Sequence, residues 1–271
     1  MGSEPGALAL SSNDDVLYVG LNGTGDVVKL RLPDMAELWR ARLPASSFFG
    51  QLFAERIAVS PLDADVVAVS MYRPTASPRH GGVALIRAGV VQPVMTQDHT
   101  GSNLIAFDAD GQFVYGFNNE STEFGLRRIV VLPDGLREEQ VVTTAAGFSL
   151  RALDWSTNGL VLDTAVYRTP ELTLLGRVNV QGGGCRPHTV PNRLLCAYNS
   201  SFDGSLGGAL AVVDANTFVI LAAPVYQRGQ AGASLSQIVP GPAGQAALRM
   251  NVTYNNSASD SVWLFTSPAL K

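Results

Sequence analysis

The sequence predicts an all-β fold, and two observations carry most of that prediction. Apolar and polar residues alternate with the period of a strand, as in Val16–Leu21 and Ala209–Val213, whereas long runs with helical periodicity are absent. Turn-forming residues follow at short intervals, for example at Asn13, Asp108 and Thr157. We therefore expect many short strands joined by tight turns.

A weak internal repeat narrows the fold class. An apolar residue followed by Asn is shared by "YVGLN", "YGFNN", "CAYNS" and "LRMNV", which begin at Tyr18, Tyr115, Cys196 and Leu248. The units are spaced by roughly 35 to 50 residues, which is the span of a four-stranded propeller blade. We expect a single β-propeller domain over residues 1–271, with about six blades at 6–44, 54–96, 101–144, 149–180, 184–226 and 233–271. A six-bladed ring and a segment of a seven-bladed ring both fit this spacing.

The last unit offers three strands instead of four. Its strand candidates are Ser236–Val239, Gln245–Met250 and Ser261–Thr266, after which only "SPALK" remains. Because an outermost strand is missing, we expect the sequence to be a segment of a longer chain, with blade material upstream and other domains in the parent protein.

Composition excludes two classes of partner. The formal charge is -4 and the basic residues are scattered, so no positive stripe is available for nucleic acid. No run approaches the roughly 18 apolar residues of a membrane span, and the N-terminus lacks the pattern of a signal peptide. We expect no membrane insertion.

The loops predict which face would bind a partner. With the strands of each blade labelled A to D from the central axis outward, the B–C and D–A loops emerge on one side, here called the loop face. Its B–C loops are long and polar, beginning at Arg73, Asn118, Asn199 and Asn251, and binding residues concentrate on such loops. The candidate ligand or partner surface is Arg73, Arg79, His80, His99, Asn103, Asn118, Glu120, Glu123, Phe202, Asp203, Tyr254 and Asn255.

Metal binding is an alternative use of the same face. His80 and His99 fall in a B–C and a D–A loop, and the carboxylates of Glu55 and Asp98 are nearby candidates as ligands. No short-spaced ligand motif supports this set, so we expect neither a metal nor another cofactor.

Two cysteines, Cys185 and Cys196, lie eleven residues apart. If the turn between them centres on Val190 and Pro191, they become cross-strand neighbours and a disulfide is geometrically feasible. Two unpaired buried thiols are the alternative.

The opening unit, "GSEPGALALSSNDDVLYVGLNGTGDVVKLRLPDMAELWRARLP", resembles the YVTN-type β-propeller repeat in its G-x-x-P start, small-apolar strand, polar turn and Tyr-Val strand. The resemblance covers Gly2–Pro44 and Ala54–Thr144. The middle of the chain also resembles a bacterial extracellular family whose propellers stand beside immunoglobulin-like modules. This implies a secreted or cell-envelope location.

These observations favour a non-enzymatic module that binds a protein or carbohydrate through the loop face. No G-x-S-x-G elbow, Gly-rich phosphate loop or H-E-x-x-H helix is present. YVTN-like propellers also resemble lactonases, which implies a metal-dependent hydrolase as a first alternative, with Glu55, His80, Asp98 and His99 as ligands or general base. A structural spacer in a surface protein is the second alternative.

Overall fold

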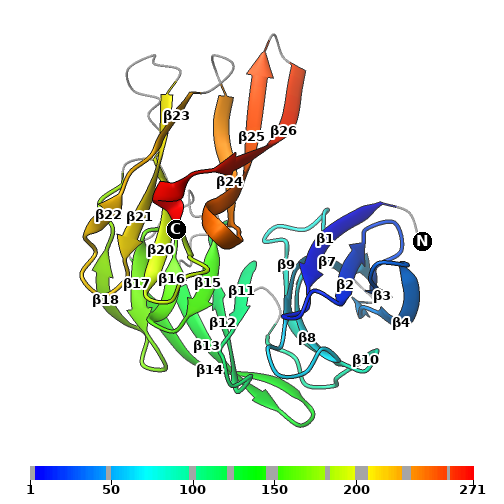
Figure 1. Cartoon of the computed structure of the whole chain (residues 1–271). Coiled ribbons are helices and arrows are strands. Elements are labelled where there is room, and N and C mark those ends of the chain that lie inside the picture. Colours follow the sequence, from blue (N-terminus) through cyan, green and yellow to red (C-terminus); the bar gives the residue numbers. More distant parts are fainter. Residues whose placement is uncertain are drawn as a thin grey trace. The chain divides into compact units, whose positions relative to one another are not determined.

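The chain is an all-β six-bladed propeller (Figure 1). The computed structural model describes residues 4–46, 50–97, 102–120, 125–144, 152–180, 184–198, 207–227, 233–254 and 257–271. Over these residues the helical content is limited to two single 3-10 turns, η1 (Pro242–Gly244) and η2 (Pro268–Leu270). No helix in the described part of the chain is long and apolar enough to cross a membrane. The prediction of an all-β propeller is confirmed.

The chain divides into two compact units, Met1–Ser149 and Leu150–Lys271. Each unit contains three of the blades, and within each blade every strand pairs antiparallel with its neighbours. The blade bounds and the single-domain organisation expected from the sequence remain predictions.

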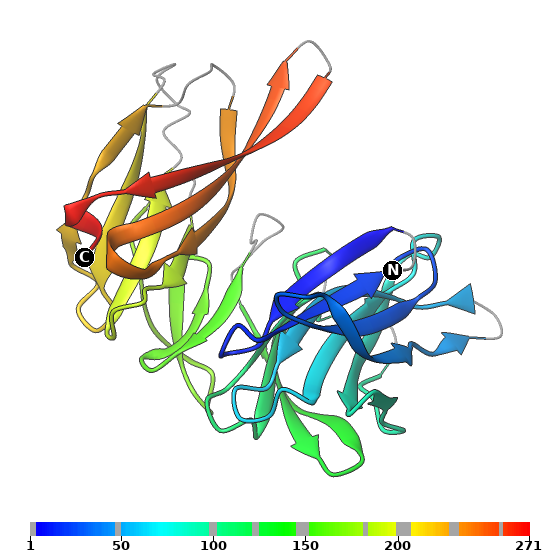
Figure 2. The ribbon, with the colours of Figure 1, turned by 45° about the vertical axis from the view of Figure 1, so that its right-hand side comes forward.

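The first unit contains three four-stranded sheets and a short hairpin (Figure 2). In chain order its strands are β1 (Pro5–Leu10), β2 (Val16–Leu21), β3 (Asp26–Arg31), β4 (Ala36–Arg42), the hairpin β5 (Ala45–Ser46) and β6 (Gly50–Gln51), then β7 (Phe53–Val59), β8 (Val66–Tyr72), β9 (His80–Arg87), β10 (Val90–Val91), β11 (Leu104–Phe107), β12 (Phe113–Phe117), β13 (Gly125–Leu132) and β14 (Gly135–Thr143).

The second unit contains the remaining three sheets. Its strands are β15 (Leu153–Ser156), β16 (Gly159–Leu162), β17 (Ala165–Arg168), β18 (Thr173–Arg177), β19 (Gly184–Pro187), β20 (Arg193–Tyr198), β21 (Gly207–Asp214), β22 (Ile220–Ala222), β23 (Val225–Gln227), β24 (Ala233–Pro240), β25 (Gln245–Tyr254) and β26 (Ser257–Thr266). In the fifth sheet β22 and β23 share one side of β21, and over the described residues the sixth sheet has three strands.

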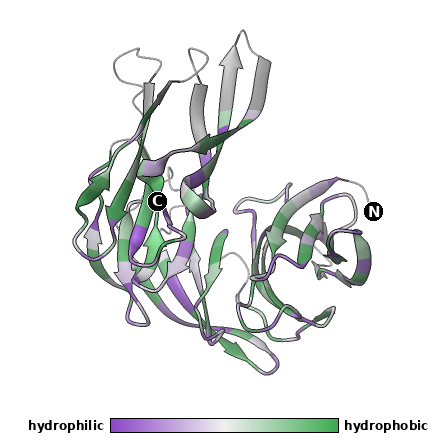
Figure 3. Ribbon diagram, in the orientation of Figure 1, coloured by the Kyte–Doolittle hydropathy of each residue, from purple (hydrophilic) through white to green (hydrophobic). Residues whose placement is uncertain are grey.

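Adjacent sheets of a unit pack through the apolar faces that strand alternation creates. In the first unit, Tyr18 and Val27 of one sheet pack in the same buried cluster as Val67 and Val69 of the next. In the second unit, Leu195 and Leu248 belong to a cluster shared by the fifth and sixth sheets. Figure 3 shows apolar residues concentrated along the strands and hydrophilic residues at many turns. Burial of these faces provides most of the driving force for folding.

One expectation about the sixth blade is wrong. The stretch from Asn251 was expected to be a long polar loop, but β25 continues through Tyr254 and pairs with β26 as far as Ser257. The physical reason is that Val252, Thr253 and Tyr254 are β-branched or aromatic residues, which fit the pleated surface of a strand. Strand pairing therefore overrides the polar composition that suggested a loop.

A candidate binding site on the loop face

An arginine from one blade joins carboxylates from two blades on the loop face of the first unit. Arg79 lies immediately before β9, Glu55 is in β7, and Glu120 follows β12. Arg79 Nη2 donates to Glu55 Oε1 at 2.6 Å, and its Nε and Nη2 both donate to the Glu120 carboxylate at 2.5 Å. The two-point contact with Glu120 fixes the orientation of the guanidinium plane. We call Glu55, Arg79, His80 and Glu120 the loop-face cluster.

His80, the first residue of β9, is the fourth member of this cluster. Its side chain is only 2% exposed, and its Nδ1 lies 4.0 Å from Glu55 Oε2. Neither of those two buried atoms has a hydrogen-bond partner. The imidazole also has a side-chain hydrogen bond with Asn118, which fixes the ring. A buried carboxylate and a buried imidazole thus face each other without a direct hydrogen bond.

The surroundings of Glu55 and Glu120 shift the pKa values of their carboxyl groups in opposite directions. Burial raises the pKa of Glu55 to about 7, and this effect outweighs the attraction of Arg79, which lowers it. The pKa of Glu120 is lowered, chiefly by its hydrogen bonds from Arg79. Burial lowers the pKa of His80, which disfavours the imidazolium. Near neutral pH, Glu120 is therefore ionised, whereas Glu55 is present in both its protonated and its ionised form.

Buried amides hold the chain where β12 ends. Asn118 Oδ1 accepts from the backbone N–H of Glu120 at 3.0 Å, and Asn103 Oδ1 accepts from the backbone N–H of Asn119 at 3.1 Å. Asn103 Nδ2 also donates to Asn119 Oδ1. The Asn118 contact is an Asx turn, in which the side chain replaces a backbone partner, and the Asn103 contacts join the ends of two paired strands. These amides therefore position Glu120 opposite Arg79.

Aromatic rings flank the exposed side of the cluster. The Arg79 guanidinium carbon lies 5.1 Å from the centroid of the Tyr72 ring, and Tyr72 lies 6.0 Å from Phe53, centroid to centroid. Both rings are partly exposed. A charged group beside half-exposed rings offers hydrogen bonding and apolar contact to one ligand.

Arg127 is a buried charged neighbour of the cluster that the sequence analysis missed. Its side chain is 1% exposed, and it donates from Nη1 to Gly125 O at 3.0 Å and from Nε to Glu138 Oε2 at 3.1 Å. Its charge contributes to the lowered pKa of His80. The one available signal was a charged residue inside the otherwise apolar strand "GLRRIVVL".

The structure brings together several of the predicted surface residues but buries most of them. Arg79 and Glu120 are about one-third exposed. The expectation of an exposed surface is wrong for Arg73, His80, Asn103 and Asn118, which are buried. Arg73 is buried because the β8–β9 loop closes on itself, with the Arg73 backbone N–H donating to Arg79 O at 2.7 Å. His80 and Asn118 are hydrogen-bonded between neighbouring sheets, and Asn103 bonds Asn119 at the end of β12. Six residues named from the sequence lie outside the described residues: Asp98, His99, Glu123, Phe202, Asp203 and Asn255.

Two of the four metal ligands expected from the sequence are among the residues that the structure describes. Glu55 and His80 are neighbours, whereas Asp98 and His99 lie outside the described residues. Among the residues that the structure describes, no three His, Cys, Asp or Glu side chains are grouped so that they could hold a metal ion. The expected ligand set therefore remains a hypothesis.

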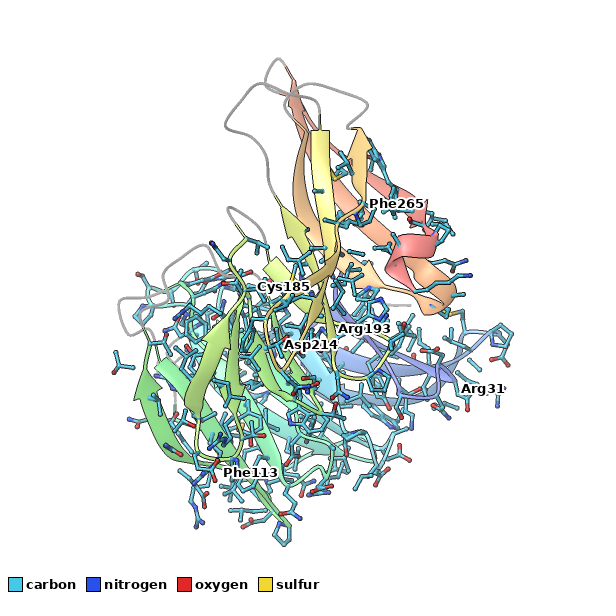
Figure 4. All side chains as sticks on the ribbon, turned by 60° about the vertical axis from the view of Figure 1, so that its left-hand side comes forward. Arg31, Phe113, Cys185, Arg193, Asp214 and Phe265 are labelled. Atoms are coloured by element: carbon cyan, nitrogen blue, oxygen red, sulfur yellow. A yellow bond between two sulfur atoms is a disulfide. The ribbon has the colours of Figure 1, made fainter. Side chains whose placement is uncertain are left out.

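Cys185 and Cys196 are joined by a disulfide in the second unit (Figure 4). They are directly opposed residues of β19 and β20, and both are buried. The bridge lies within one sheet of the second unit, whereas the loop-face cluster belongs to the first unit.

Comparisons with solved structures support the fold. The chain matches U3-55K at 12% identity and a TM-score of 0.62, covering 96% of this chain and 81% of that one. It matches a candidate 6-phosphogluconolactonase from Bacteroides fragilis at 11% identity and a TM-score of 0.61, covering 96% and 83%. A match to Kuenenia stuttgartiensis hydrazine synthase has 12% identity and a TM-score of 0.49; it covers 98% of this chain, which spans 65% of that one.

At these identities the two matches with TM-scores above 0.6 show the propeller fold alone. No family model matches the chain, and no curated protein does. The resemblance to the YVTN-type repeat is therefore not confirmed.

Proposed function

We propose that this chain is a non-enzymatic binding module that recognises a protein or carbohydrate ligand through the loop-face cluster. The observation that supports this most directly is the placement of Arg79 between Glu55 and Glu120, with distances of 2.5 to 2.6 Å. Three strand ends from two blades contribute to one polar centre, and propeller loops on a rigid scaffold are suited to recognition.

The chemistry of the cluster suits a polar ligand. Glu120 and Arg79 present an exposed acceptor and donor side by side, while Glu55, His80 and Asn118 support them from the interior. The Tyr72 ring supplies an apolar surface next to the guanidinium. A ligand hydroxyl or amide therefore meets hydrogen-bonding groups whose positions are already fixed, which reduces the entropy lost on binding.

The test uses defined arrays of glycans and of extracellular protein domains. We expect at least one ligand whose binding falls by about tenfold or more in Arg79→Ala, as for a central interface residue. Arg31→Ala is the matched control, because Arg31 forms an exposed ion pair with Asp34 at 2.7 Å. A ligand that binds both variants like the unmodified protein would place recognition elsewhere.

A hydrolase is a second candidate, because the pKa of Glu55 near 7 is suited to general acid or base catalysis. The likeness to a candidate 6-phosphogluconolactonase is at the level of fold and adds only weak support. Hydrolysis of a sugar lactone, followed by titration with and without added calcium or manganese, separates the two functions. This candidate requires turnover that Glu55→Gln abolishes. A structural spacer requires neither turnover nor binding.

The disulfide supports a secreted or cell-envelope location. Bridges such as Cys185–Cys196 form and persist mainly in oxidising compartments. Fractionation of the native host, with the bridge monitored by thiol labelling, tests this assignment.

A further inference from the structure

A polar pocket of about 420 Å³ lies in the second unit, on the side of the short A–B and C–D turns. Its walls come from the turn between β15 and β16, from β17 and β18, and from the turn that follows β21. The volume is within the range of about 300 to 1,000 Å³ that small-molecule sites occupy. This site belongs to one unit and is independent of the loop-face cluster.

The pocket contains one charged side chain, Arg168 at the end of β17. Arg168 is exposed, and its guanidinium has no hydrogen bond or ion pair with any residue that the structure describes, whereas its backbone oxygen accepts from the Leu172 N–H at 2.9 Å. An unpaired guanidinium presents a planar donor set that matches a carboxylate in two-point geometry. The charge of the pocket therefore favours an anionic ligand.

The asparagine side chains of the polar wall of the pocket are held in place by hydrogen bonds. Asn158 Nδ2 donates to the side-chain oxygens of Asn192 and Asn216, at 2.9 Å each. Asp214, labelled in Figure 4, accepts through Oδ1 from the backbone N–H groups of Asn216 and Thr217 at 3.0 and 2.8 Å. The turn that carries Asn216 is thus pre-formed. Hydroxyls of Thr157 and Thr169 complete a lining suited to several ligand hydroxyls.

Phe218 supplies an apolar wall from an unusual backbone conformation. Its φ is 61°, in the left-handed region that a bulky residue rarely adopts. The ring packs on Gly176, where an added Cβ would lie 2.4 Å from Phe218 Cε2. The turn around Asp214 holds this conformation, with the Phe218 N–H donating to Asp214 O at 2.8 Å. Strained residues of this kind concentrate at functional sites.

We propose that this pocket binds a small sugar acid, with its carboxylate on Arg168, its hydroxyls on the Thr and Asn side chains, and one ring face against Phe218. Each part of the ligand matches one part of the lining: the unpaired guanidinium of Arg168, the hydrogen-bonded polar wall and the partly exposed ring of Phe218. A neutral sugar lacks the first interaction, and a simple carboxylate lacks the other two.

Isothermal titration with D-glucuronate, D-glucose and acetate tests the proposal. Glucuronate is expected to bind more tightly than either other probe. Arg168→Gln is expected to weaken glucuronate binding by roughly 10- to 100-fold, the effect of losing a hydrogen bond to a charged group. Arg137→Gln, which removes an exposed arginine from the first unit, is the charge-matched control and should leave binding unchanged.

A second variant guards against a folding defect. Phe218→Asn keeps a residue that tolerates the left-handed conformation but removes the ring, so it should weaken glucuronate binding. Because the ring packs on Gly176 and the neighbouring core, the thermal midpoint should also fall, while unfolding stays cooperative. Equal binding of glucuronate and glucose, equal binding of glucuronate and acetate, or unchanged affinity in Arg168→Gln would each overturn the proposal.

Discussion

Arg79 Nη2 lies 2.6 Å from Glu55 Oε1, yet burial still raises the pKa of Glu55 to about 7. Arg79 shares its charge with Glu120, whose carboxylate receives two hydrogen bonds from the same guanidinium. The positive charge of Arg79 therefore only partly offsets the cost of ionising the buried Glu55 carboxyl group. The charge state of the loop-face cluster depends on all three residues together.

The first prediction concerns this coupling. Arg79→Met should raise the pKa of Glu55 further, because the positive charge of Arg79 lowers it. Glu120→Gln should lower it, because the negative charge of Glu120 raises it and its loss leaves Arg79 to Glu55. Side-chain 13C NMR titration of Glu55 measures both shifts. Shifts in the same direction would contradict the cluster as described.

The second prediction links Glu55 to stability. Its pKa rises from an ordinary 4.5 to about 7 on folding, so the folded protein binds this proton more tightly. The contribution of Glu55 to stability is therefore fully present below pH 4.5 and is lost as the pH rises to 7, by up to about 3 kcal/mol. Glu55→Gln should remove this loss, whereas Glu4→Gln should keep it, since Glu4 is exposed.

Urea unfolding at pH 4.5 and 7.5 makes the comparison. His80, whose pKa is lowered, acts in the opposite sense below its ordinary value of 6.5, and it is present in all three proteins. If the free energy of unfolding differed between the two pH values by the same amount in Glu55→Gln, Glu55 would not be the source of that difference.

The third prediction concerns the disulfide. Replacing Cys185 and Cys196 by Ala should lower the free energy of unfolding by about 2 to 4 kcal/mol, because the unfolded chain regains the freedom of a closed loop. Denaturant titrations with and without reductant provide the measurement. The unmodified protein should be weakened by reductant to about the level of the variant, and the variant itself should not respond.

The fourth prediction concerns a glycine that permits close backbone contact. Gly135 has a φ of 145°, and a Cβ there would lie 1.9 Å from Val94 O, where Leu136 N–H donates to the same oxygen at 2.9 Å. Gly135→Ala should destabilise the first unit by more than the roughly 1 to 2 kcal/mol of backbone strain alone.

Gly50→Ala is the matched control for that variant. Its φ of 77° is also in the left-handed region, but nothing lies within 4 Å of an added Cβ. Thermal unfolding of both variants separates steric overlap from backbone strain, and equal losses of stability would contradict the close contact.

Much of the fold follows from patterns in the sequence. The apolar run Val16–Leu21 matches the observed bounds of β2, but five of its six residues are buried. The strand is therefore identified by its β-forming residues and bounding turns, as a strand covered on both faces is. Glu55, Arg79, His80 and Glu120 could be assigned to one face because alternating strands place B–C and D–A loops on the same side. Assigning these residues to one face requires only the order of the strands in each blade.

Other features depend on contacts between distant residues and were not predictable. The burial of Asn118 and His80 arises from packing between blades, which a polar loop sequence does not indicate. The pocket at Arg168 requires Phe218, 50 positions later, to fold over Gly176. The extension of β25 to Tyr254 depends on its pairing with β26.

The central claim is that ligand recognition occurs at the loop-face cluster, and the affinity of Arg79→Ala for a ligand identified on the arrays tests it most directly. We predict a loss of about tenfold or more, a smaller loss in Glu120→Gln, and no change in Arg31→Ala, with all three variants still folded and unfolding cooperatively at the assay temperature. A folded Arg79→Ala variant that binds every detected ligand with unchanged affinity would contradict the claim.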